Sequence, residues 1–240
     1  MGLGKDGEFM TTAMRIPLRY LVLHTDRPVT ETGTNLRGYI ADRFPQYALL
    51  HQHLDRPLLA YPKVQYKMLA GTPSILGIAD GASVLKEITD DITELEFHSN
   101  TYKVLQKVTY DQLIPIIPSK DLVEYRFVSS WLGLNQENYQ KWREIYEWKE
   151  RKQFLNAILV GNLLSMAKGL GVVIEHRLNV QSHLEQVPAQ YKGVGMTGFI
   201  GSIRVNLQLP DYIGIGKGVS QGFGTLRHAV PVKSQQAPIR

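Results

Sequence analysis

The sequence predicts an α+β protein built from two tandem ferredoxin-like domains, the second carrying a C-terminal glycine-rich loop. Three observations predict this fold: a β-α-β-β-α-β succession in the first half, a partial repeat of that succession in the second half, and five glycines between residues 214 and 224. We expect the domains to span residues 13–114 and 121–232. A chain of 240 residues has enough material for two buried cores.

The first half contains the complete succession of six elements. Residues 15–24 are rich in aromatic and branched side chains, which is typical of a strand. A helix is expected over 34–44, begun by Thr34 or Asn35, because apolar residues recur there at every fourth position and a proline follows. A hairpin over 64–78 then leads into a helix that begins at Asp80. The strands that complete the unit are expected at 95–97 and 102–108.

The second half repeats the pattern less completely. The proline-containing stretch 114–119 is expected to link the domains. Asn135 is a suitable cap for a long helical region that reaches Met166 and that the charged run 149–152 divides. The expected strands are 123–129, 172–180, 194–199, 202–209 and 223–230, with the glycine loop in the place of a second crossover helix.

The glycine loop matches neither standard nucleotide-binding loop. A dinucleotide fingerprint needs glycine at 219 or 221, and a P-loop needs glycine at 211 and a hydroxyl at 218; none of these is present. Glycine backbone folds tightly enough to set several N–H groups against an anion, so a phosphodiester-gripping loop is one interpretation. A flexible hairpin connection is the other. The candidate binding residues are Gly214, Gly216, Lys217, Gly218, Gly222, Gly224 and the following Arg227.

The distribution of charge favours the phosphate-binding interpretation. The chain carries a net charge of +5, and from residue 186 onward its basic side chains are opposed by Asp211 alone, which leaves residues 1–185 neutral. The absence of cysteine excludes disulfides, thiolate catalysis and cysteine-based zinc sites. No apolar run approaches membrane-spanning length, and we expect a cytoplasmic protein.

The second chemical feature is the sequence His51-Gln52-His53. In extended backbone both imidazoles point to the same side, and two groups that titrate near neutrality can act as base and acid. On a helix they would be splayed apart. A zinc site with Asp55 and a pair of surface histidines without a role are the alternatives. Further candidates for orienting the substrate or stabilising charge are Tyr47, Lys63 and Lys67, the two lysines because they share one strand face with a tyrosine.

These motifs resemble a known family. The glycine-rich segment 214–224 resembles the signature of the CRISPR-associated repeat-processing endoribonucleases, the Cas6 family. The segments 36–40, 51–53, 61–67 and 78–88 are similar to its b-type branch, which carries paired histidines at this position. The resemblance covers roughly residues 15–90 and 190–230, and the helical region 131–170 matches no motif.

The resemblance implies two ferredoxin-like domains and a metal-independent cut within the repeat of a CRISPR precursor transcript. The 2′-hydroxyl attacks the neighbouring phosphate and leaves a 2′,3′-cyclic phosphate and a 5′-hydroxyl. His53 and His51 would be the acid–base pair, and the glycine loop with Arg227 would hold the RNA backbone. No cofactor and no metal are expected.

The expected partner is CRISPR repeat RNA, and effector-complex subunits and a second copy of the chain are left open. Two other functional hypotheses stand beside the endoribonuclease. One is a non-catalytic RNA-binding relative or effector-complex subunit, which gives no reason for the histidine pair. The other is an unrelated metal- or phosphate-binding protein.

Overall fold

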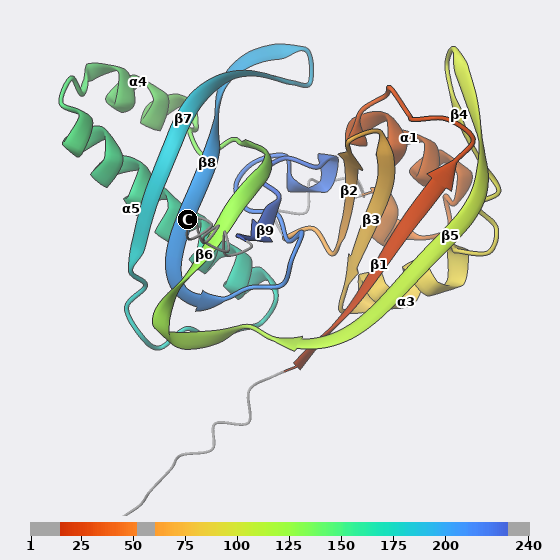
Figure 1. Ribbon diagram of the computed structural model, residues 1–240, viewed down its shortest axis with the longest axis horizontal. Helices are drawn as coiled ribbons and strands as arrows, with labels where there is room; N and C mark the ends of the chain where they lie inside the picture. Colours follow the sequence, from red (N-terminus) through yellow and green to blue (C-terminus); the bar gives the residue numbers. More distant parts are fainter. Residues whose placement is uncertain (1–14, 52–60, 230–240) are drawn as a thin grey trace, which may run out of the picture.

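Two antiparallel sheets, one from each half of the chain, lie side by side in the computed structural model (Figure 1). The structure describes residues 15–51 and 61–229. Helices α1 and α3 pack on the first sheet and α5 packs on the second. The α+β class with two antiparallel sheets is therefore confirmed. Within the described residues, no helix combines the length and apolar composition needed to cross a bilayer.

The first sheet has the strand order β2-β3-β1-β5-β4, and each neighbouring pair is antiparallel. Most of its elements form where the sequence predicts them, but the strand expected at 102–108 extends over residues 100–115, and a short helix at 48–51 is not predicted. Thr32, rather than Thr34 or Asn35, precedes the first residue of α1. The Asn35 side chain instead accepts hydrogen bonds from the backbone and hydroxyl of Thr32, at 3.1 and 2.7 Å. The elements are β1 (Arg15–Thr25), α1 (Gly33–Arg43), α2 (Ala48–His51), β2 (Val64–Leu69), β3 (Thr72–Ile78), α3 (Asp80–Ile88), β4 (Glu94–Phe97) and β5 (Asn100–Pro115).

The second sheet has the order β7-β8-β6-β9, which repeats the order of the first sheet without its extra edge strand. Helices α4 and α5 take the place of the first crossover helix, and the glycine loop takes the place of the second. Asn135 caps α4 as expected, because its side chain accepts from the Asn138 N–H at 2.7 Å. The elements are β6 (Ile117–Trp131), α4 (Gln136–Glu144), α5 (Trp148–Gly169), β7 (Val180–Tyr191), β8 (Val194–Gln208), the 3₁₀ turn η1 (Val219–Gln221) and β9 (Leu226–His228).

The expected linker at 114–119 is not a loop. β5 runs to Pro115 and β6 begins at Ile117, so the two sheets are joined strand to strand through the buried Ile116. Both prolines pair at the ends of strands, Pro115 with Arg15 and Pro118 with Leu207, where a missing N–H is tolerated.

Three other expectations in the second half are wrong. The strand expected at 172–180 is absent, because the Val172 N–H still donates to the Ala167 carbonyl at the end of α5, and β7 pairs with β8 only from Val180 onward. The strands expected at 194–199 and 202–209 form one strand, β8, which passes through Gly201 at φ +120°. The last strand is limited to Leu226–His228, and the residues before it belong to the glycine loop.

The two halves share buried apolar contacts. One core lies within the first domain, between its sheet and helices. The other is built mainly from the second half but also includes Ile16, Leu18, Leu76 and Ile78 of the first sheet. The junction between the domains is thus part of a core.

Candidate active site

The glycine loop (residues 214–224) is held in a conformation that other residues rarely adopt. Gly216, Gly218, Gly222 and Gly224 have φ angles of +89°, +75°, +93° and +62°. A Cβ atom at Gly224 would also collide with the carbonyl oxygen of Ile215. The glycines are therefore required by the fold of the loop itself.

Much of the loop backbone is already hydrogen-bonded to protein. The N–H groups of Ile215, Lys217 and Gly224 donate to the carbonyls of Gly224, Leu132 and Ser130, and those of Gln221 and Phe223 both donate to Gly218. These N–H groups are therefore not free to bind an anion. This differs from the sequence-based interpretation, in which several N–H groups of the loop face a phosphate. In the middle of the loop Gly216 and the Lys217 side chain are exposed.

Two cations surround one aromatic ring beside the loop. The Lys217 ammonium lies 4.9 Å and the Lys192 ammonium 5.8 Å from the ring centroid of Tyr191, at the end of β7. They border a groove of about 840 Å³ between the β7–β8 hairpin and the start of α4. Arg227 lies apart from them, with its guanidinium 5.8 Å from the ring centroid of Tyr212.

The first domain holds the beginning and the end of the loop through an interdomain clamp, which we define as Tyr61, Gln65, Lys67, Gly214 and Thr225. The Tyr61 hydroxyl donates to the Gly214 carbonyl at 2.6 Å, and the Gly214 N–H donates to Gln65 Oε1 at 3.0 Å. Lys67 Nζ donates to Gln65 Oε1 at 3.1 Å and to Thr225 Oγ1 at 3.2 Å. The strand face that the sequence identified therefore meets the glycine loop.

Lys67 is almost completely enclosed in this clamp. Its relative exposure is 2%, and the partners of its ammonium are neutral oxygens. Burial lowers the pKa of Lys67 to about 7, because desolvation disfavours the charged form. The sequence gives no sign of this role, since alternation shows which residues share a face but not what that face contacts.

Helix α1 connects the loop to the first histidine. At its N-terminus, Thr34 Oγ1 donates to Gln221 Oε1 of the loop at 3.3 Å. One turn further on, Arg37 Nη2 donates to the carbonyl of His51. Neither contact was anticipated from the sequence.

His51 is the last residue of the short helix α2, so the extended backbone expected there is wrong. Its Nε2 atom is buried, and none of the residues that the structure describes supplies a hydrogen-bond partner for it. His53 and Asp55 lie outside the described residues, so the geometry of the expected pair is not observed.

Tyr47 and Lys63 are each bonded to a carboxylate. The Tyr47 hydroxyl donates to Glu87 at 2.8 Å, and this hydrogen bond raises the pKa of Tyr47. Lys63 forms an ion pair with Asp80 on α3, which lowers the pKa of Asp80. Lys63 therefore does not join Lys67 in the clamp.

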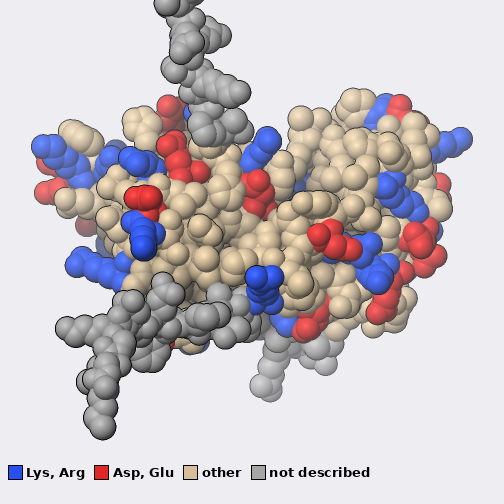
Figure 2. All heavy atoms as spheres, turned by 60° about the horizontal axis from the view of Figure 1, so that its bottom comes forward, with Lys and Arg blue, Asp and Glu red and all other residues tan. Residues whose placement is uncertain are grey.

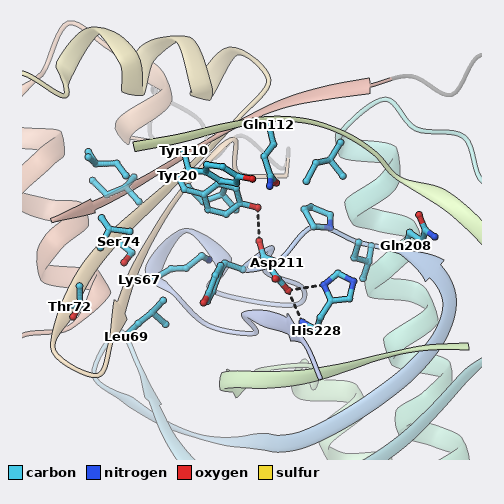
Figure 3. A pocket seen from close by; sticks show the side chains of 18 of the residues that line it. Tyr20, Lys67, Leu69, Thr72, Ser74, Tyr110, Gln112, Gln208, Asp211 and His228 are labelled. Carbon is cyan, nitrogen blue, oxygen red and sulfur yellow. Dashed lines mark hydrogen bonds and ion pairs between the residues drawn. The ribbon is translucent and has the colours of Figure 1, made fainter. Parts of the chain in front are cut away.

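A cleft of about 680 Å³ lies between the open faces of the two sheets, and Lys67 of the clamp is one of the residues that line it (Figure 3). The Tyr20 hydroxyl donates to the backbone carbonyl of Asp211 at 2.8 Å, and Asp211 Oδ1 lies 2.8 Å from His228 Nδ1. Tyr110 and Tyr212 add aromatic faces to the lining. The sequence did not indicate this cleft, because its lining comes from stretches far apart in the chain.

The basic residues of the second half do not form one continuous patch. Lys192 and Lys217 border the groove, whereas Arg227 lies beside Tyr212, and Lys233 and Arg240 are outside the described residues. On the face seen in Figure 2, acidic and basic side chains are interspersed.

Comparison with known proteins decides the family. A family model described as the Cas6b N-terminal domain matches residues 14–113, and one described as the Cas6b C-terminal domain matches residues 117–229. The chain belongs to the Cas6b family. The family resemblance seen in the sequence is therefore confirmed.

Individual Cas6b structures and one sequence relative agree with this assignment. A crystal structure of Cas6b has a TM-score of 0.82 at 29% identity and covers 90% of this chain and 100% of that chain. A structure described as a CRISPR RNA processing endoribonuclease, Cas6b, has a TM-score of 0.70 at 28% identity, with 89% and 100% covered. An uncharacterized protein of Methanocaldococcus jannaschii is 36% identical over 141 residues, which are 58% of this chain and 95% of that protein.

Proposed function

We propose that this Cas6b-family protein is an endoribonuclease that cuts CRISPR precursor RNA within the repeat, without a metal ion. One imidazole accepts the proton of the 2′-hydroxyl, and O2′ attacks the adjacent phosphorus. The P–O5′ bond breaks, and the other imidazolium donates its proton to O5′. The products are a 2′,3′-cyclic phosphate and a 5′-hydroxyl end.

The observation that carries this proposal is the position of His51. Its Nε2 is buried without a partner among the described residues, and α1 joins its backbone to the glycine loop of the other domain. Because none of the described residues binds this nitrogen, we propose that its partner is a proton of the substrate. We assign His51 and His53 as the acid–base pair and do not assign which of them is the base.

The RNA backbone is proposed to follow the exposed centre of the glycine loop. Lys217 and Lys192, gathered around Tyr191, supply the positive charge, and Arg227 supplies a further phosphate contact nearer the cleft. The loop glycines act through the shape that they give the loop. Because Lys67 is buried in the clamp, we give it a positioning role, and we leave Tyr47 and Lys63 as candidates for orienting the substrate.

The proposed function is accompanied by proposals for the domain boundaries, the cellular location and the protein partners. We propose two tandem ferredoxin-like domains with boundaries near 13–114 and 121–232, the first carrying the histidines and the second the RNA-binding loop. A cellular transcript as substrate places the protein in the cytoplasm. Effector-complex subunits and a second copy of the chain are the proposed protein partners.

The deciding experiment is cleavage of the cognate repeat RNA by the purified full chain in excess EDTA, followed by gel and end-group analysis. We expect one cut with a cyclic-phosphate end. His51→Ala/His53→Ala is expected to lower the rate by about 10²-fold or more, since each acid–base group contributes about 10²–10⁴-fold. His98→Ala, which removes an exposed histidine from the β4–β5 turn, is the matched control and should cleave normally.

Two outcomes would contradict the proposal in different ways. Cleavage that EDTA abolishes and zinc restores would point to a metal site at the histidines. RNA that is bound but left intact would identify a non-catalytic RNA-binding protein and remove the catalytic role of the two histidines.

A further inference from the structure

Strand β5 presents a long free edge. Its inner edge pairs with β1 from Arg15↔Pro115 to Thr25↔Val104, whereas β4 covers its outer edge only at Asn100–Lys103. From residue 104 to 115 the outer edge pairs with no strand among the described residues, and β5 runs along the border of the sheet (Figure 1). A free edge is a row of N–H and C=O groups ready to pair with another chain.

Apolar side chains are exposed along this edge, on either side of the charged Lys107 and Asp111. Leu105, Val108, Tyr110 and Leu113 have relative exposures of 69%, 42%, 59% and 62%. The other sheet borders are short or interrupted: β4 has four residues, β9 has three, β2 has six and meets the glycine loop, and β7 contains a proline. Among the described strands, β5 is therefore the border best suited to pairing.

The sequence of this edge is complementary to itself. If two copies pair antiparallel about a two-fold axis at Thr109, Lys107 of each copy lies opposite Asp111 of the other. In the same register Val108 lies opposite Tyr110, and Leu105 lies opposite Leu113. A shift of the axis by one residue position or more along the strand removes the Lys107–Asp111 match. Two-fold symmetry makes every favourable pair occur twice.

The charged groups of this edge are accessible to a second copy. The Asp111 carboxylate accepts from Arg19 at 3.1 Å, yet 64% of its side chain is exposed. Lys107 Nζ donates to the carbonyl of Asp90 at 2.7 Å, at the exposed surface. β5 makes a bulge at Leu105, between the pairs His24↔Gln106 and Thr25↔Val104, which limits straight pairing about Thr109 to residues 106–112, with Leu105 and Leu113 at its two ends.

We propose that two copies of this chain associate through their β5 edges, antiparallel and centred on Thr109, so that the first sheets of both copies form one continuous sheet. Backbone hydrogen bonds supply affinity, and the Lys107–Asp111 and Val108–Tyr110 pairs set the register. This inference does not depend on the proposed RNA cleavage.

The absence of cysteine makes the register directly testable. In Thr109→Cys the two introduced thiols face each other across the axis, at a separation that a disulfide can span. Under mild oxidation we expect rapid formation of a disulfide-linked dimer of the full chain. Val173→Cys, at a loop position with 81% exposure, is the control and should cross-link only slowly. A mixture of Lys107→Cys and Asp111→Cys proteins should give the mixed dimer in preference to either homodimer.

Sedimentation over a concentration series tests the association without cross-linking. Lys107→Glu sets two like charges opposite each other, and we expect the dimer dissociation constant to rise about tenfold. Lys107→Glu/Asp111→Lys restores opposite charges and should recover most of the affinity. A wild-type chain that stays monomeric at every concentration, or Thr109→Cys that cross-links no faster than Val173→Cys, would overturn the proposal. RNA cleavage by the Lys107→Glu monomer would leave the proposed function intact.

Discussion

At the scale of single residues, the least expected feature is a lysine buried where the two domains meet. Lys67 and Gln65 are buried to 2% and 0% exposure, and each has one partner from the other half of the chain, Thr225 for Lys67 and Gly214 for Gln65. Gln65 occupies the centre, since its Oε1 accepts from both Gly214 and Lys67 and its Nε2 donates to Tyr61. Buried polar groups of this kind are costly whenever one partner is removed.

Gln65→Ala is therefore expected to lower the free energy of unfolding by about 1–3 kcal/mol, because the Gly214 N–H and the Lys67 ammonium both lose an acceptor. Urea denaturation measures this change. The matched control, Gln181→Ala on the exposed surface of β7, should stay within about 0.5 kcal/mol of wild type. If both variants unfold alike, the clamp does not stabilise the junction.

The pKa of Lys67 predicts a pH dependence of stability. Burial lowers this pKa from 10.5 to about 7, so between these pH values the unfolded chain binds a proton that the folded chain does not. Stability linked to Lys67 should therefore rise with pH through this window, by at most about 1.4 kcal/mol per pH unit, and should be flat below it.

Lys67→Met removes this dependence. The remaining clamp groups keep partners, since Gln65 Oε1 still accepts from Gly214 and Thr225 Oγ1 donates to the Gly222 carbonyl. We expect the variant to have a higher free energy of unfolding than wild type at pH 6–7. The difference between the two proteins should become smaller as the pH rises toward 10. Lys120→Met, at an exposed position, should follow wild type at each pH. A gap that stays constant with pH would show that Lys67 does not change protonation on folding in this range.

At the scale of elements, alanine substitutions at two glycines are expected to have opposite effects on stability, because one glycine is required by the loop and the other lies in a helix. A Cβ at Gly224 would collide with the Ile215 carbonyl at a left-handed backbone position, whereas one at Gly38 in α1 meets nothing within 4 Å. Gly224→Ala should cost at least about 2 kcal/mol of unfolding free energy. Gly38→Ala should add about 0.5–1 kcal/mol, because alanine loses less entropy in a helix. Thermal or urea unfolding that ranks these variants in the opposite order would contradict the loop geometry.

Some helices and strands could be predicted from the sequence and others could not. Strong periodicity located α1 and the β2–β3 hairpin, because their apolar faces are buried by local elements. β7 was missed, because an edge strand with polar residues and Pro188 carries little alternation. The helical turn at His51 was missed because four residues are too few to show a helical period. The clamp at Gln65 was missed because it depends on a contact with Gly214, far away in the chain. Residue types predict a chemistry for the site, which stays a prediction, and they do not reveal which faces meet.

At the scale of the whole molecule, the two domains are expected to unfold as one unit. Residues of the first sheet belong to the core of the second domain, and the clamp and the strand-to-strand junction add further contacts. All three tryptophans, Trp131, Trp142 and Trp148, lie in the second half, so their fluorescence reports on that half alone. Far-UV circular dichroism reports on both. Coincident midpoints in urea are expected, and a separated fluorescence transition would show independent domains.

The clamp also has a consequence for how the protein is made. A ribosome releases residues 65 and 67 long before residues 214 and 225, with which they bond across separations of 149 and 158 positions. Until then the first domain holds a lysine and an amide on a face whose cover has not been synthesised. Its native state is therefore reached only when nearly the whole chain has emerged, and no nascent fragment that ends before Thr225 can be a finished first domain.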